Sequence, residues 1–281
     1  MTNRKDEVRS LLKLTPEEII KKAGNKLIVC NNLDELHLRF AEDIAKEIMS
    51  NNAKNISTRL ILPIGPTGQY PILVKIIKEK KISLENCWFF FMDEYCDEEG
   101  KSLPETHPLS FKRVANSLFL NHVKENGVQL NQVFIPSDMN INQLATTIYE
   151  VGGINVCFGG IGIHGHIAFN EPEQGITKKG VRKVNLNDYT ITINAVRAQI
   201  GGNLENFPRY AYTLGMREVL NSNKIRLYCR NGANFDWANT ILRIALFGTP
   251  GDDYPVTHIR NHPNYTIITD KDTLATPKNL I

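Results

Sequence analysis

A glycine-rich stretch between Gly159 and Pro172 carries the residues of this chain best suited to chemistry. Its four glycines within seven positions let the backbone turn sharply and approach a ligand closely, because glycine tolerates positive φ and has no side chain. His164, His166 and Glu171 add imidazole and carboxyl groups, whose pKa values can be tuned for proton transfer near neutral pH. The two histidines could equally ligate a metal ion, and their spacing leaves both kinds of site open.

Asp93 is a second candidate for chemistry. It follows the apolar run from Trp88 to Met92, which predicts a buried strand. A carboxyl group just past such a strand loses solvation, which raises its pKa and makes it a usable general base. Acidic residues also begin loops and cap helices for structural reasons. Both interpretations of the turn from Met92 to Tyr95 therefore stand.

A third turn contains Gly65, Pro66, Thr67 and Gly68, between a predicted strand and a predicted helix. Glycines in such a turn expose backbone N–H groups, and the amino end of the helix adds partial positive charge, so the turn can hold an anion such as phosphate. The alternative is an ordinary strand-to-helix turn. No Gly-Lys-Ser/Thr follows, so it is not a Walker loop.

Each of these turns comes directly after a predicted strand. Strands are predicted at 26–30, 60–62, 88–92, 133–135, 154–158 and 226–229, and helices at about 33–48, 70–80, 108–123 and 141–151. The alternation of apolar strands with helices predicts an α/β fold with a doubly wound, mostly parallel, Rossmann-like sheet covered by helices on both faces. Ligands bind such sheets beyond the carboxyl ends of the strands. We therefore expect the three turns to meet there.

The chain divides, on this interpretation, into two parts. Residues 1–25 form a helical extension with two short helices, the second beginning at Thr15 with Pro16 at its first position. Residues 26–281 form a single α/β domain, because no repeat or Gly/Ser-rich linker interrupts them. Whether the extension covers an interface is open.

Composition narrows the possible partners. A net charge of +3 with interspersed acidic and basic residues gives no clustered basic face for nucleic acid. No run of about 18 apolar residues predicts a membrane span, and the polar start of the chain is unlike a signal peptide. The five cysteines lack any CxxC pair, so we expect buried free thiols in a reducing cytoplasm and no zinc site or disulfide framework.

Five motifs together give the chain a recognisable resemblance. They are Leu62–Thr67, Met92–Tyr95, His107–Phe111, Gly165–Pro172 and Pro208–Gly215. From about Lys26 to the C-terminus the chain resembles the glucosamine-6-phosphate deaminase (isomerase) family, which is related to the 6-phosphogluconolactonases. The sequence Ile-Ala-Phe-Asn-Glu-Pro after Gly165-His166 favours the deaminase branch.

The resemblance implies a reaction on an amino-sugar phosphate. The aspartate matching Asp93 moves a proton between C2 and C1 of the open-chain sugar. The histidine matching His166 assists ring opening, and the glutamate matching Glu171 orients and charges it. The resulting 2-imino compound is hydrolysed to fructose 6-phosphate and ammonia. This chemistry needs no metal, no nucleotide and no other cofactor.

The resemblance also implies where a small sugar phosphate binds. The phosphate lies against the turn from Gly65 to Gly68 with help from Arg197, and Asn170 belongs to the substrate-binding motif. Family members range from monomers to hexamers, so a homo-oligomer is open. The segment from Gln174 to Asn187 is either a mobile lid or effector contact, or a solvated loop.

The chain departs from the family pattern at three positions. His164 stands where the family has an aspartate, Arg230 in Arg230–Asn234 stands near a family phosphate-binding lysine, and Pro66 replaces a glycine and removes one N–H donor. A second imidazole repels a proton where a carboxylate would hold it. We therefore expect His166 to rely on Glu171 alone and to titrate lower than in typical members.

Four further functions remain open. The chain could isomerise another sugar phosphate, or bind sugar phosphates as a regulator that has lost catalysis. It could also be a 6-phosphogluconolactonase-like hydrolase. A metal hydrolase built on His164 and His166 is the fourth possibility.

Overall fold

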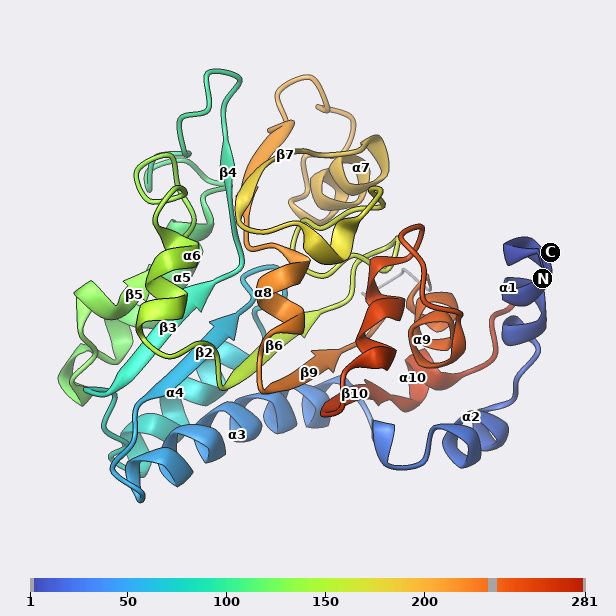
Figure 1. The fold of residues 1–281 in the computed structure, drawn as a ribbon, viewed down its shortest axis with the longest axis horizontal. Helices are drawn as coiled ribbons and strands as arrows, with labels where there is room; N and C mark the ends of the chain where they lie inside the picture. The colour runs from blue at the N-terminus through green and yellow to red at the C-terminus, as the bar shows by residue number, and fades with distance from the viewer. Residues whose placement is uncertain (1–2, 232–236, 280–281) are drawn as a thin grey trace.

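A seven-stranded sheet forms the centre of the computed structural model, which describes residues 3–231 and 237–279 (Figure 1). The strands, in their order across the sheet, are β1 (Leu27–Cys30), β10 (Tyr265–Asp270), β9 (Lys224–Tyr228), β6 (Val156–Gly160), β2 (Thr58–Leu62), β3 (Cys87–Phe91) and β5 (Val133–Phe134). All neighbouring pairs are parallel. This confirms the expected α/β fold with its parallel sheet.

The strand order reverses between β2 and β6. From β2 the chain builds outward through β3 to β5, then returns to the other side of β2 and builds outward again through β6, β9 and β10. A reversal of this kind leaves a crevice beyond the carboxyl ends of the two adjacent strands. The turn at Gly65 follows β2 and the glycine and histidine stretch follows β6, so both open into this crevice.

Helices cover the two faces of the sheet because successive strand residues point in opposite directions. Leu60 and Leu62 pack with helices α3 (Leu33–Asn52), α4 (Gln69–Glu79) and α5 (Phe111–Leu118). Ile61, between them, packs with the helices of the other face. These are α6 (Leu144–Glu150), α8 (Met216–Leu220), α9 (Ala238–Phe247) and α10 (Lys271–Leu274). Figure 1 shows α3 and α4 together below the sheet.

The amino-terminal helices α1 (Arg4–Leu12) and α2 (Pro16–Ala23) form as expected, and α2 begins with a capping box at Thr15 and Glu18. They lie beside α9 at the β10 end of the molecule (Figure 1). Leu11 and Ile19 join the main hydrophobic core, and buried Arg243 of α9 donates to the Leu14 carbonyl. The extension is thus packed onto the α/β unit.

A second sheet is the main feature that the sequence did not predict. It is antiparallel, has the order β4-β8-β7, and consists of β4 (Asp93–Cys96), β8 (Tyr210–Thr213) and β7 (Arg182–Asn185). The turn expected from Met92 to Tyr95 is therefore mostly strand. The expected lid or solvated loop from Gln174 to Asn187 instead contains β7 and a short 3₁₀ turn.

The charged sequence of β7 explains why the segment from Gln174 to Asn187 was expected to be a lid or a loop. β7 is an edge strand, and its residues Arg182 and Lys183 are the kind of charged residues that protect an exposed edge. Helix α7 (Asp188–Arg197) packs beside this sheet over an apolar cluster that includes Tyr95, Phe169 and Phe207. In Figure 1, β4, β7 and α7 project beyond the strand ends of the main sheet.

Two helices are shorter than expected. The expected helix at 108–123 is α5, which spans only Phe111–Leu118, and that at 141–151 is α6, which spans Leu144–Glu150. Helix α5 begins late because the Ser110 side chain accepts a hydrogen bond from the Arg113 N–H and so caps it. The strand expected at 154–158 is shifted, since β6 continues through both glycines to Gly160.

All five cysteines are buried free thiols, as expected. Within 3–231 and 237–279, no helix is both long enough and apolar enough to cross a bilayer.

Glu94 anchors the start of α5 to β4. Its side chain is buried, and its carboxylate accepts hydrogen bonds from the N–H groups of Tyr95, Phe111 and Lys112 and from the Ser110 hydroxyl, at 2.8–3.0 Å. Because this carboxylate binds the first N–H groups of the helix, it also fixes α5 against β4, next to Asp93.

We predict that Glu94→Gln lowers the free energy of unfolding by about 2–4 kcal/mol, because an amide presents donors where the protein needs an acceptor. Urea denaturation measures this. Glu99→Gln on the exposed loop is the matched control and should change stability by less than about 0.5 kcal/mol. Equal stabilities of the two variants would contradict the role given to Glu94.

Candidate active site at the carboxyl ends of β2 and β6

A cavity of about 630 Å³ lies at the reversal point of the sheet. Residues from all three predicted turns line it: Gly65 and Pro66 from the first, Asp93 from the second, and His166 from the third. Arg197 and Arg230 line it as well. The structure therefore brings together six of the residues singled out from the sequence.

Asp93 is the first residue of β4 and is only 8% exposed. Its Oδ1 accepts hydrogen bonds from the Phe169 N–H at 2.9 Å and from the Thr213 hydroxyl at 2.5 Å. Burial raises the pKa of Asp93 to about 7, with a smaller contribution from the charge of Glu94, although these two donors oppose the rise. Both hydrogen bonds end on Oδ1, which leaves Oδ2 to interact with a ligand.

A strained turn presents the Phe169 N–H to Asp93. Ala168 has a φ of +53°, which costs a residue with a Cβ atom about 1–2 kcal/mol. The turn is held by Asn170, whose backbone N–H and side-chain amide both donate to the Ile167 carbonyl. The fold thus maintains a strained backbone at the point where it supports the candidate base.

Asn170, which the resemblance assigns to substrate binding, makes its hydrogen bonds within the protein. It is fully buried and is not among the residues that line the cavity. Its amide also donates to the Leu214 carbonyl at 2.8 Å, and its carbonyl accepts from Arg182 at 2.9 Å. Because the protein itself uses its donors and acceptor, Asn170 holds the turn and ties it to the second sheet.

His166 depends on a glycine for its position. A Cβ atom on Gly162 would lie 1.9 Å from His166 Nε2, so only glycine leaves room for the imidazole there. The Gly162 N–H donates to the His166 carbonyl, which closes the turn. Burial lowers the pKa of His166 well below its ordinary value, and the nearby His164 and Arg197 lower it further. The imidazole is therefore neutral at pH 7.

The expected support of His166 by Glu171 is not seen. Glu171 Oε2 accepts a hydrogen bond from the Asn187 N–H at 2.8 Å, just before α7, and burial raises the pKa of the carboxyl group. Within the part of the chain that the structure describes, Glu171 makes no hydrogen bond to His166, and Nδ1 of that ring is buried without a partner. One oxygen of the carboxylate is thus held by the start of α7, whereas Oε1 is buried without a hydrogen-bond partner among the described residues.

His164 lies beside His166 but outside the cavity lining. Its ring meets that of Tyr189 edge-on at 5.0 Å, and the two histidine ring centroids are 6.1 Å apart. Burial lowers the pKa of His164. The pair thus consists of two neutral imidazoles, which agrees in direction with the low titration expected of His166. Among the described residues, no group of three or more His, Cys, Asp or Glu side chains is placed to hold a metal ion.

Two guanidinium groups give the cavity positive charge. Arg197 ends α7 and lies 5.6 Å from the Trp237 ring centroid, and Arg230 follows β9 and donates to the Asn231 carbonyl at 3.1 Å. Neither forms an ion pair with a carboxylate of residues 3–231 or 237–279. Burial lowers the pKa of both arginines. The charge of Arg230 also lowers the pKa of Arg197, and the charge of Arg197 lowers the pKa of His166. Arg230 is partly buried and Arg197 is exposed, and two cations at one cavity favour an anionic ligand.

The predicted phosphate turn is only partly at the cavity. Gly65 and Pro66 line it, whereas Thr67 and Gly68 do not. The Thr67 carbonyl accepts from the Tyr70 N–H inside the turn, and Gly68 lies beneath the ring of His37. The residues Gly232, Ala233 and Asn234, part of the segment compared with the family lysine, lie outside the described residues.

Sequence reasoning missed several residues of the site: His37, Asn194, Gln199, Thr213 and Trp237. A signal existed for His37, which falls on the apolar side of α3 next to the cavity-lining Leu33 and Leu36. Asn194 precedes Arg197 by three residues and so shares its helix face. Nothing in the sequence pointed to Trp237.

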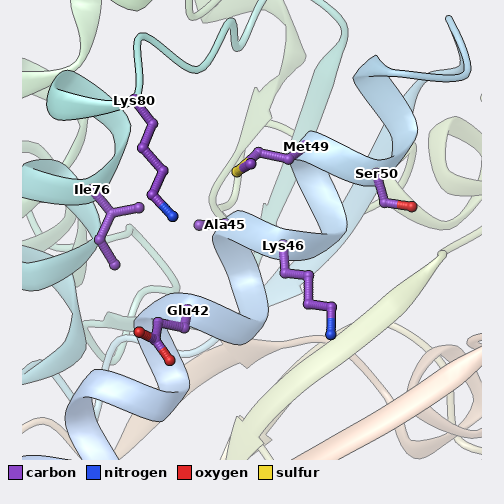
Figure 2. A pocket seen from close by; sticks show the side chains of 7 residues that line it. All are labelled: Glu42, Ala45, Lys46, Met49, Ser50, Ile76 and Lys80. Atoms are coloured by element: carbon purple, nitrogen blue, oxygen red, sulfur yellow. The ribbon is translucent and has the colours of Figure 1, made fainter.

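A second hollow, of about 470 Å³, lies between α3 and α4, away from these residues. Figure 2 shows Ile76 and Lys80 on one side of it and Ala45 and Met49 on the other. None of the candidate site residues lines it.

Known proteins similar to the chain share its architecture. Over 253 residues the chain is 30% identical to the glucosamine-6-phosphate deaminase of Thermoanaerobacter pseudethanolicus, covering 89% of this chain and 94% of that protein. A solved monomeric glucosamine-6-phosphate deaminase has a TM-score of 0.77 at 24% identity, covering 88% and 98% of the two chains. A 6-phosphogluconolactonase from Thermotoga maritima has a TM-score of 0.61 at 16% identity, covering 87% and 99%. No protein-family model matches the chain.

The parallel sheet and the cavity at its reversal point place the chain in the fold class shared by these deaminases and lactonases. Sequence similarity then distinguishes the two branches. The chain belongs to the glucosamine-6-phosphate deaminase family and is a deaminase-like enzyme.

The burial of Asp93 predicts a pH-dependent stability. The pKa of this carboxyl group is 3.8 in the unfolded chain and about 7 in the folded protein, so folding favours its protonated form. The free energy of unfolding therefore falls as the pH rises between these two values. We predict that the free energy of unfolding of the wild type falls relative to Asp93→Asn by up to about 4 kcal/mol between pH 4 and pH 8, since each unit between the two pKa values is worth about 1.4 kcal/mol.

Urea denaturation of both proteins at several pH values measures this difference. Parallel pH profiles for the wild type and Asp93→Asn would show that Asp93 titrates as an ordinary surface carboxylate.

Proposed function

We propose that the chain converts glucosamine 6-phosphate to fructose 6-phosphate and ammonia. The observation that carries this proposal is the Asp93 carboxyl group, whose pKa is raised to about 7 in a cavity that also holds His166, Arg197 and Arg230. The family to which the chain belongs supports the same reaction.

Asp93 is the proposed base for the 1,2-proton shift. Its ionised carboxylate accepts the proton from C2 of the open-chain sugar and returns it to C1. The C1 carbonyl oxygen gains a proton and becomes a hydroxyl group, the amino nitrogen loses one, and an imine is left at C2. Because its pKa is about 7, both the ionised and the protonated form are accessible near neutral pH. Water then adds to the imine carbon, and ammonia leaves.

His166 is proposed to assist the preceding ring opening. A neutral imidazole can accept the proton of the C1 hydroxyl group and supply one to the ring oxygen, since its two nitrogens can serve as acceptor and donor. The low pKa of His166 keeps it neutral at pH 7, and its unpaired Nδ1 leaves one nitrogen without a competing partner in the described structure.

The phosphate group is proposed to lie near Gly65 and Pro66 with Arg197 and Arg230. Arg230 is partly buried and Arg197 is exposed, and neither forms an ion pair with a carboxylate in the described ranges, so a phosphate ester would add the negative charge that they lack. Arg230 would take the place of the lysine expected by resemblance.

A second candidate is isomerisation of another sugar phosphate without release of ammonia. It is favoured by the absence of any carboxylate hydrogen-bonded to His166 or His164 among the described residues. The proton shift at Asp93 would be unaffected, whereas the departure of ammonia, which needs a proton donor to nitrogen, would be slow.

We predict that the wild type releases ammonia from glucosamine 6-phosphate and that Asp93→Asn lowers kcat by at least about 100-fold, because the variant cannot accept the C2 proton. A coupled ammonia assay measures both, with galactosamine 6-phosphate as a second substrate. Asp6→Asn, on the exposed surface of α1, is the matched control and should retain full activity. No ammonia from either substrate, with a folded wild type that still binds sugar phosphates, would contradict the proposal.

His164 offers a separate test of the imidazole electrostatics. We predict that His164→Asp raises the pKa of His166, because a carboxylate stabilises the imidazolium, and that the acid side of the kcat/KM profile moves to higher pH, because the neutral imidazole is the active form. The pH dependence of kcat/KM shows the direction of the shift.

His164→Asn is the matched control, since it removes the same imidazole without adding charge. If this neutral variant reproduced the profile of His164→Asp, the charge at position 164 would not be the cause.

A further inference from the structure

His37 is a partly buried polar residue of the cavity that the proposed mechanism does not use. It lies on α3 and lines the cavity together with Gly65, Pro66 and Arg230. Its Nε2 is inaccessible to solvent and has no hydrogen-bond partner among the described residues. Leaving such a group unpaired costs about 1–3 kcal/mol, so a hydrogen bond from this nitrogen to a ligand in the cavity would be stabilising.

The position of this imidazole is built into the fold. A Cβ atom on Gly68 would lie within 2.6 Å of three atoms of the His37 ring, so the ring rests directly on the backbone of the turn after β2. Glycine at position 68 therefore makes the space that His37 occupies. The ring is placed at the amino end of α4, next to the two turn residues that line the cavity.

Nearby charges suit a donor to an anion. Arg230, after β9, is close enough to lower the pKa of His37, while Asp34 on the same helix and Asp270 at the end of β10 oppose this effect. Burial has the largest influence and also lowers that pKa, so the ring is neutral at pH 7 and carries one N–H.

We propose that His37 donates a hydrogen bond to the phosphate group of the substrate and forms one subsite with Arg230, Gly65 and Pro66. This inference rests on the proposed function for the nature of the ligand. Pro66 lacks an N–H, so it cannot donate to phosphate from the turn. His37 supplies a donor from α3 at the same side of the cavity, which compensates for that loss.

Binding measurements without turnover test this proposal. Isothermal titration calorimetry with inorganic phosphate, fructose 6-phosphate and fructose compares the wild type with His37→Ala and His37→Gln. We expect His37→Ala to weaken both phosphate-containing ligands by about 10-fold, because one hydrogen bond to an anion is lost. His37→Gln keeps a side-chain N–H donor and should restore most of the affinity, and fructose should bind weakly to all three proteins.

His122→Gln is the matched control, because His122 is exposed on the short turn after α5 and does not line the cavity. Thermal denaturation of each variant checks that it is folded. If a folded His37→Ala bound phosphate within twofold of the wild type, or if the wild type bound neither phosphate nor fructose 6-phosphate, the inference would be wrong.

The outcome is separable from that of the ammonia assay. Phosphate affinity that depends on His37 in a protein that releases no ammonia would support the subsite while overturning the proposed deamination. Ammonia release by the wild type, together with unchanged phosphate affinity in His37→Ala, would support the proposed deamination and overturn the role of His37.

Discussion

The site depends on the removal of the Asp93 carboxyl group from water. That removal requires the second sheet, because β8 places Thr213 opposite Asp93 and supplies the hydroxyl that donates to it. It also requires the Ala168 turn, which supplies the Phe169 N–H. Two donors on one oxygen keep the carboxyl group ionisable near neutral pH, whereas burial without them would raise its pKa further. A usable base therefore emerges from a balance between desolvation and two fixed hydrogen bonds.

The ionisable groups of the cavity differ in their charge states. The carboxyl group is raised in pKa, the histidines are kept neutral, and the two arginines stay charged without carboxylate partners in the described residues. A cavity with this balance favours an anionic ligand that also carries an exchangeable proton. Arg197 ends α7, which packs on the second sheet, so the sheet that supports Asp93 also positions one of the cations.

Sequence alone predicted the parallel sheet and six of its strands, because these are nearly continuous apolar runs, but it predicted no strand at β10. It also predicted which turns meet, since the carboxyl ends of parallel strands share one edge. The second sheet was missed because β7 carries the charges of an edge strand and β4 follows β3 with one residue between them. The hydrogen-bond partners of Asn170 and Glu171, such as Arg182 and the Asn187 N–H, come from that unpredicted region, so the sequence could not predict these contacts.

Direct titration of Asp93 tests this account most sharply. Carbon-13 NMR of protein labelled at the aspartate carboxyl carbons follows each carboxyl group, and the signal absent from Asp93→Asn identifies Asp93. We predict that the Asp93 signal titrates near pH 7. An Asp93 signal that titrates near pH 4, as an ordinary solvated aspartate does, would contradict the claim that desolvation makes this residue the base.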